Sequence, residues 1–162
     1  MTELEYTLQE ISYSRKEDSR ILEAVLKNWF KDPKSLNFVD PRMSFPFQFK
    51  EWIKLSYQTE QTITTILKKN LWIIGYLSMH LRLERKNCYL FHLFIDPQFR
   101  NKGLAQRITQ EMETYGKQLG AQSFSIFLVP KNVPAKNLYR KLGYEERGQS
   151  INGLIKLHKK II

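Results

Sequence analysis

The stretch LFIDPQFRNKGLA, residues 93–105, joins an apolar segment to an amphipathic one through a short loop. Upstream, NCYLFHLFI from Asn87 to Ile95 is almost continuously apolar, which is typical of a strand buried on both faces, and Pro97 ends it. Downstream, apolar residues recur at three- or four-residue spacing up to Gly120, which predicts an amphipathic helix. These residues are Leu104, Ile108, Met112, Tyr115 and Leu119. The loop therefore leads from a buried strand into a helix N-terminus.

The loop itself has the composition of an anion-binding turn. Its pattern is R-x-x-G-x-A, from Arg100 to Ala105, with small residues where the backbone would approach a ligand. Successive N–H groups and the helix dipole would converge there on a negative charge. The alternative is purely structural, since any strand–loop–helix unit can carry a glycine at its turn.

A second strand–helix unit follows and gives the loop its context. SFSIFLV, Ser123–Val129, predicts another buried strand that Pro130 ends, and Asn132–Leu142 predicts a short helix closed by Gly143. The segment NVPAKNLYRKLGY and the R-x-x-G-x-A loop after a strand together resemble the sequence motifs of the GNAT superfamily of acyl-CoA-dependent N-acyltransferases. The resemblance covers about residues 72–144 and does not extend to the first sixty residues.

The remaining elements follow from periodicity and turn signals. We expect a first strand at Tyr6–Ile11 and two strands at Thr62–Lys69 and Leu71–Glu84 that continue into Asn87–Ile95 as a meander. Asn152-Gly153 predicts a two-residue hairpin turn near the C-terminus. One apolar stripe predicts a helix; it comprises Ile21, Leu22, Val25, Leu26, Trp29 and Phe30.

The segment between this helix and the meander is harder to interpret. Its residues 31–48 contain Pro33, Pro41 and Pro46, which predicts an irregular connection, and a shorter helix is expected at Phe49–Tyr57. An aromatic cluster lies here, for which helical spacing favours core packing and a wall of the acceptor pocket is the alternative. The cluster comprises Phe45, Phe47, Phe49, Trp52, Ile53 and Tyr57.

The resemblance implies the fold class. It is an α/β (α+β) fold with a mixed central sheet, helices on both faces, and two central strands, Tyr89–Ile95 and Ser123–Val129, that run parallel but splay apart. We expect one N-acetyltransferase domain over residues 1–162, because this length suits a single core.

The resemblance also implies acetyl-CoA as the acyl donor. The pantetheine arm would hydrogen-bond the backbone of the splayed strand, and the pyrophosphate would sit on the amides of the loop. The thioester oxygen would point to an N–H near Phe94 or Ile95. The expected cofactor-binding residues are Leu93, Phe94, Ile95, Arg100, Asn101, Lys102, Gly103, Leu104, Ala105, Asn132 and Tyr139.

Two proton transfers are expected to need catalytic groups. Tyr139 matches the family tyrosine and is the expected general acid for the departing thiolate; a buried packing role is the alternative. Many relatives carry a carboxylate in the strand that here reads CYLFHL, and this strand has none. His92 is the only conventional base there, and a histidine satisfied within the core, or deprotonation through water, is the alternative. Asn132 is alternatively a turn residue.

Charge supports a phosphate-bearing donor. Residues 1–60 hold nine Lys+Arg against ten Asp+Glu, whereas residues 61–162 hold seventeen against six. A basic rim would steer coenzyme A. Alternatively, several of these cations are solvated strand ends that discourage aggregation. They are Lys68, Lys69, Arg85, Lys86, Lys159 and Lys160.

Other classes of function are disfavoured. Cys88 is the only cysteine and is more typical of a buried hydrophobe than of a nucleophile, which favours transfer in a ternary complex over a ping-pong route. Three dispersed histidines suggest no metal site, and no motif typical of nucleic-acid binding is found. Without an 18-residue apolar stretch or a secretory leader, we expect a cytoplasmic protein without membrane contact.

The expected function is an N-acetyltransferase that acts on a primary amine of a small molecule or of a peptide or protein, as a monomer or homodimer. The near-neutral first sixty residues favour a cationic or neutral acceptor over an acidic one. The alternatives are a longer acyl-CoA donor, or a catalytically inactive acyl-CoA-binding module.

Overall fold

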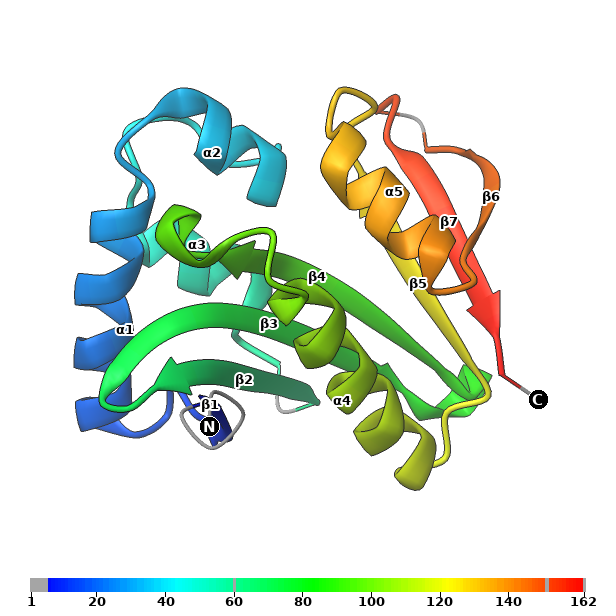
Figure 1. Ribbon diagram of the computed structural model, residues 1–162, viewed down its shortest axis with the longest axis horizontal. Coiled ribbons are helices and arrows are strands. Elements are labelled where there is room, and N and C mark those ends of the chain that lie inside the picture. The colour runs from blue at the N-terminus through cyan, green and yellow to red at the C-terminus, as the bar shows by residue number, and fades with distance from the viewer. Residues whose placement is uncertain (1–5, 60, 151, 162) are drawn as a thin grey trace.

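The computed structural model describes residues 6–59, 61–150 and 152–161. They form a seven-stranded mixed sheet with the strand order β1-β2-β3-β4-β5-β7-β6 (Figure 1). The strands are β1 (Tyr6–Ile11), β2 (Thr62–Lys69), β3 (Trp72–Arg82), β4 (Asn87–Ile95), β5 (Ser123–Leu128), β6 (Glu145–Gln149) and β7 (Ile155–Lys160). The helices are α1 (Lys16–Trp29), α2 (Pro33–Val39), α3 (Phe49–Ser56), α4 (Leu104–Gln118) and α5 (Val133–Lys141). The expected α/β class is confirmed.

Helices cover both faces of the sheet, because neighbouring strand residues point to opposite sides. On β2, Leu67 belongs to a core cluster shared with α4 and α5, whereas Ile66 belongs to a second cluster shared with α1, α2 and α3. Figure 1 shows α4 in front of the strands β2–β4 and α1 at the left edge of the view. No helix among the described residues is long and apolar enough to cross a membrane.

The two central strands splay, as the resemblance implies. β4 and β5 pair in parallel only from Asn87↔Ser123 to Tyr89↔Ser125. At this closed end the Asn87 side-chain amide donates to the hydroxyls of Ser123 (2.9 Å) and Ser125 (3.2 Å). Beyond it, β5 continues beside β7 alone, and Figure 1 shows the two halves of the sheet diverging. The rest of β4 therefore has a backbone edge free of strand pairing on its β5 side.

Two local predictions are wrong. The segment expected to be irregular contains α2, which begins where the Asp32 carboxylate accepts a hydrogen bond from the Ser35 N–H (2.8 Å) and Pro33 occupies the first turn. The expected two-residue hairpin is longer, since β6 ends at Gln149 and β7 begins at Ile155. Its turn is closed by a hydrogen bond from the Gly153 N–H to the Ser150 carbonyl (3.0 Å).

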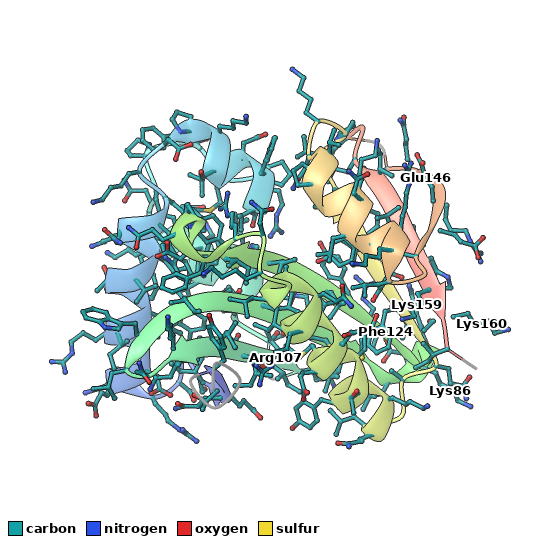
Figure 2. All side chains as sticks on the ribbon, in the orientation of Figure 1. Lys86, Arg107, Phe124, Glu146, Lys159 and Lys160 are labelled. Carbon is teal, nitrogen blue, oxygen red and sulfur yellow. The ribbon has the colours of Figure 1, made fainter. Side chains whose placement is uncertain are left out.

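The packing of α4 on the sheet depends on a close approach at Gly116. A Cβ atom placed there would lie 2.8 Å from the Phe124 ring and 3.2 Å from the Met79 sulfur, and both side chains are fully buried (Figure 2 labels Phe124). We expect Gly116→Val to lower the free energy of unfolding by about 3 kcal/mol, because overpacking outweighs any gain in helix propensity.

Urea denaturation would measure this loss. Lys117→Val on the exposed face of the same helix is the matched control and should cost only about 0.5 kcal/mol. Equal effects of the two substitutions would mean that the contact between Gly116 and Phe124 does not limit the position of α4.

Candidate active site

The loop before α4 presents unpaired backbone N–H groups. Asn101 (φ 63°) and Gly103 (φ 76°) adopt the left-handed conformation, and Leu104 then begins the helix. Within the described part of the chain, no acceptor receives the N–H groups of residues 101–106. Alternation of left- and right-handed residues at a helix N-terminus makes a concave array of donors. The geometry is that of an anion-binding nest.

A cavity of about 680 Å³ opens over this nest. Of the expected loop residues, Lys102 does not line it; those that do are Arg100, Asn101, Gly103, Leu104 and Ala105. Lys34 of α2 and Lys141 of α5 also line it, and neither was predicted, because no local pattern distinguishes them from other surface lysines. The three cations Lys34, Arg100 and Lys141 give the cavity the positive rim expected for a phosphate ligand.

Arg100 holds the end of β4 as well as facing the cavity. Its Nε donates to the Ile95 carbonyl (2.8 Å), and its guanidinium lies 4.9 Å from the centre of the Phe94 ring. Burial lowers the pKa of Arg100, and Asp96 and Asp32 oppose this shift. The Ile95 carbonyl already accepts a hydrogen bond from Arg100. A ligand that lies along this edge of β4 would therefore hydrogen-bond other backbone groups of the strand.

The nest makes a direct prediction for Gly103. No atom lies within 4 Å of a Cβ placed there, so the side chain of Gly103→Ala would enter the open cavity while its backbone remained at positive φ. We expect the KM for the expected acyl-CoA donor to rise about tenfold with little change in kcat, because the donor binds the left-handed loop and roughly 1–2 kcal/mol of strain shifts the free loop away from that conformation.

Steady-state kinetics with a varied concentration of the expected acyl-CoA donor would measure the change. The matched control is Gly120→Ala, which has positive φ (112°) and an equally open Cβ position, but lies at the other end of α4. It should lower stability and leave KM unchanged. A raised KM in the control alone would contradict the assignment of the nest.

A second cavity, of about 260 Å³, is lined by residues of β4, β5 and α5 and by the end of α2. It contains both predicted catalytic residues, Tyr139 and His92. Five residues line both cavities, so the two spaces meet where the end of α2, β4 and the start of α5 come together: Phe38, Val39, Leu93, Asn132 and Ala135. Phe94 and Ile95, the expected oxyanion donors, line only the larger cavity.

Tyr139 is 2% exposed and packs edge to face against Tyr144, with ring centres 5.3 Å apart. Burial raises its pKa well above the ordinary value for tyrosine, while a hydrogen bond with Thr109 opposes that shift. Tyr139 is therefore a neutral hydroxyl at any pH near 7, so it holds a proton that it can donate.

Asn132 has the local role that was its alternative interpretation, at the start of α5. Its side-chain oxygen caps α5 by accepting from the Ala135 N–H (3.3 Å). Since only the oxygen is used, the NH₂ group remains available to a ligand at the junction of the cavities.

His92 lies in a β-bulge. Its φ is 63°, and the register of β3 and β4 shifts between Tyr76 and Ser78. A bulge redirects side chains, and here it turns His92 toward α2 and α3, where the ring stacks on Trp52 with centres 3.8 Å apart. Left-handed backbone in a histidine costs of order 1–3 kcal/mol, so the surroundings must hold it in place.

Those surroundings include Asp40, which sequence reasoning missed. The Nε2 of His92 lies 2.7 Å from a carboxylate oxygen of Asp40, and both side chains are almost fully buried. Arg42 binds the same carboxylate through Nε (3.0 Å) and Nη2 (2.9 Å). Burial would raise the pKa of Asp40, but the hydrogen bonds from His92 and Arg42 hold it well below its usual range. Asp40 is therefore an anion that only accepts hydrogen bonds.

This acceptor fixes the tautomer of His92. Nε2 must carry the hydrogen that faces Asp40, so Nδ1 accepts from the Tyr57 hydroxyl at 2.7 Å. Behind Tyr57 the donors form a chain: Trp52 Nε1 to Tyr13 (3.0 Å), Tyr13 to Tyr76 (2.7 Å) and Tyr76 to Tyr57 (2.6 Å). Burial lowers the pKa of His92 and Asp40 opposes the shift, which favours the neutral ring.

Of the remaining candidates, Cys88 takes no part in this constellation, whereas Trp52 and Tyr57 of the expected aromatic cluster contact His92. Cys88 is fully buried, and burial raises the pKa of its thiol to about 11, which supports a packing role. The expected aromatic cluster lines neither cavity; Trp52 and Phe47 lie in the core beneath α1 and α3, which supports the packing interpretation. Among the described residues, no group of three or more His, Cys, Asp or Glu could hold a metal ion.

Comparison with known proteins matches this architecture. A model of the acetyltransferase (GNAT) family matches residues 14–144. The uncharacterized N-acetyltransferase YhfO of Bacillus subtilis is 26% identical over 99 residues, which cover 59% of this chain and 66% of YhfO. Human N-acetyltransferase 8 is 28% identical over 68 residues, which cover 42% of this chain and 30% of that protein. The chain thus spans less than two thirds of the length of these relatives.

Solved structures share the fold over nearly the whole chain. PaiA N-acetyltransferase from Thermoplasma acidophilum, in complex with coenzyme A, has a TM-score of 0.72 at 15% identity and covers 96% of this chain and 98% of its own. Spermidine N-acetyltransferase from Vibrio cholerae, in complex with coenzyme A and spermine, has a TM-score of 0.73 at 15% identity and covers 97% and 96%. The family match extends over most of the chain, through both splayed strands and both helices that follow them, and the chain therefore belongs to the acetyltransferase (GNAT) family.

Proposed function

We propose that this protein transfers the acetyl group of acetyl-CoA to a primary amine by direct attack in a ternary complex. The observation that carries the proposal is the meeting of two cavities at Leu93 and Asn132, one over an anion nest and the other at Tyr139. A phosphate-bearing donor and an amine can enter from opposite sides and react at the junction. Approximation of this kind removes much of the entropic barrier to a bimolecular reaction.

The donor would be held chiefly by backbone groups. The diphosphate would sit on the N–H groups of residues 101–105, and the pantetheine arm would lie along the edge of β4 that β5 leaves free. Leu93, which lines both cavities, is then the strand residue nearest to the thioester. Lys34 and Lys141 would face the phosphates, and Arg100 would both face them and hold the end of the strand.

The reaction moves two protons. The amine nitrogen attacks the thioester carbon, the carbon–sulfur bond breaks, and the thiolate of coenzyme A takes a proton from Tyr139. Burial raises the pKa of this tyrosine. The apolar surroundings raise the pKa of the thiol too, so the two groups remain closer in proton affinity than their values in water suggest.

His92 is proposed to accept the proton that the amine loses. Its Nδ1 is occupied by the Tyr57 hydroxyl, but that hydroxyl lies 2.8 Å from the Ser78 oxygen and can turn to donate there. Nδ1 is then released while Nε2–H stays on Asp40, which stabilises the imidazolium. Transfer to a water molecule is the competing route.

The proposal is tested by incubating the protein with acetyl-CoA and a panel of primary amines while thiol release is followed and the product is identified by mass. Acetylation of one acceptor class is the expected result. Transfer only from longer acyl-CoA donors would revise the donor. Tight coenzyme A binding without transfer to any amine would overturn the proposal and assign a binding module instead.

A further inference from the structure

The carboxylate that lines the smaller cavity is already paired with cationic and N–H groups of the protein. Asp40 is its only lining carboxylate among the described residues, and the Asp40 side chain is 3% exposed. Its oxygens accept from the Arg42 backbone N–H (3.1 Å), from two atoms of the Arg42 guanidinium, and from His92 Nε2. A cationic substrate therefore finds no free carboxylate in this lining.

The guanidinium that lines this cavity, that of Arg42, is accessible to a ligand. The Arg42 side chain is 50% exposed and lines the same cavity. Besides Asp40, its guanidinium donates through Nη2 to the Ser56 hydroxyl (2.7 Å) and through Nη1 to the Leu55 carbonyl (3.4 Å). Four of the five hydrogens are used, which holds the group in place and leaves one Nη1 hydrogen for a ligand.

A second cation lies beside one of the residues that line this cavity. Arg82 lies 5.1 Å from the centre of the Tyr89 ring, and Tyr89 lines the cavity. Burial raises the pKa of Tyr89, and both Arg42 and Arg82 oppose that shift. Burial, Arg82, His92 and Arg42 together lower the pKa of the neighbouring His80 to about 4, so His80 is neutral near pH 7.

The remaining lining is mostly apolar. It includes Phe38, Val39, Leu90, Phe127, Leu128 and Leu154. A volume of about 260 Å³ accommodates a ligand of amino-acid size rather than a folded partner. The cavity thus combines an apolar body, one exposed guanidinium, a second cation beside the lining residue Tyr89, and the hydroxyl of Tyr139 in its lining.

On the basis of the proposed function, we propose that the acceptor is a small apolar amino acid or a similar amine that carries a carboxylate near its amino group. The carboxylate would pair with Arg42, the apolar side chain would fill the cavity, and the free amine would attack the thioester. The amine nitrogen gains the acetyl group and loses a proton, and coenzyme A leaves as the thiol. Polyamines are disfavoured because their additional positive charges meet Arg42 and Arg82 and no free carboxylate.

The test compares matched acceptors: L-phenylalanine, L-phenylalaninamide, 2-phenylethylamine and spermidine, with rates expressed per concentration of unprotonated amine. We expect kcat/KM for phenylalanine to exceed that of phenylalaninamide and phenylethylamine by about tenfold or more, the effect of one hydrogen bond to a charged group. Preference for spermidine, or equal rates for phenylalanine and its amide, would overturn the inference while leaving the transferase intact. No acetylation of any amine would overturn the proposed function and this inference together.

Variants can distinguish a loss of carboxylate recognition from a general loss of folded protein, because the ratio of kcat/KM for phenylalanine to that for its amide does not depend on how much protein is folded. In Arg42→Gln, kcat/KM for phenylalanine relative to its amide should fall to near one, even if both values drop because Asp40 has lost its partner. Arg82→Gln, for which no hydrogen bond to Asp40 or His92 is found in the described chain, should reduce the ratio about threefold. Lys117→Gln, an exposed change on α4, is the control and should leave the ratio unchanged. An unchanged ratio in Arg42→Gln would overturn the assignment.

Discussion

Asp40→Asn is expected to lower the free energy of unfolding by about 3 kcal/mol and to reduce activity at the same time. Removing one partner of a buried ion pair typically costs about 3–5 kcal/mol, and we expect the lower end because water can solvate the half-exposed Arg42. In one orientation the asparagine NH₂ group would face donors of Arg42, and in the other it would face donors of Arg42 and His92, so at least one of the present contacts must be lost. Activity falls because Asp40 orients the proposed base.

Urea denaturation of the variant beside Glu23→Gln would check the magnitude. Glu23 forms an exposed ion pair with Lys27 (2.8 Å) on α1, and such pairs contribute little, so this control should change stability by less than about 1 kcal/mol. Similar losses in the two variants would show that the contacts among Asp40, His92 and Arg42 do not stabilise the fold.

The loss should also depend on pH with a definite sign. The pKa of Asp40 is lowered on folding, so its ionisation stabilises the protein fully above its unfolded value of about 4, and this contribution declines as the pH falls further. Burial lowers the pKa of His92 in both proteins, so the loss of stability that this causes below about pH 6.5 is common to them and cancels in their difference. The difference between the wild-type protein and Asp40→Asn should therefore be constant from about pH 5 to 6 and shrink below pH 4. A difference that grows on acidification would contradict this linkage.

The donor side of the site could be predicted because its signals are local. A buried strand, a glycine with positive φ and an amphipathic helix lie within one continuous stretch, and backbone amides bind an anion whatever the neighbouring side chains are. Gly103 and Leu104 therefore lie where the pattern placed them. Lys102 does not line the cavity, since a pattern in sequence gives the loop but not the direction of each side chain.

The acceptor side could not be predicted, because its key contacts join distant residues. Asp40 lies 52 positions from His92 and follows a seven-residue helix, too short to show apolar periodicity. An aspartate before a proline is by itself a turn signal. The β-bulge changes the direction of the His92 side chain relative to a regular strand, and no residue type in this apolar segment of the sequence indicates a bulge. Only Asp32-Pro33, a capping residue followed by proline, could have revealed α2.

Tyr139→Phe is expected to lower kcat by at least about a hundredfold while the protein stays folded, because a positioned general acid contributes about 10²–10⁴ to the rate. Without the hydroxyl, the thiolate of coenzyme A must leave unprotonated from an apolar junction, where its charge is poorly solvated. The KM for acetyl-CoA should change little, since the nest and the edge of β4 are unaffected. Loss of one buried hydrogen bond should cost only about 1 kcal/mol of stability.

Tyr144→Phe is the matched control for this prediction. Tyr144 is a neighbouring buried tyrosine whose hydroxyl donates to Glu113 (2.6 Å), and it does not line the cavity. Its loss should lower stability by about 1.5–3 kcal/mol, as for a hydrogen bond to a charged group, and leave kcat near the wild-type value. Steady-state kinetics and urea denaturation of both variants give opposite patterns if Tyr139 is the acid. Near-normal turnover in Tyr139→Phe would instead assign that tyrosine to packing, and the proton on sulfur would have to come from water.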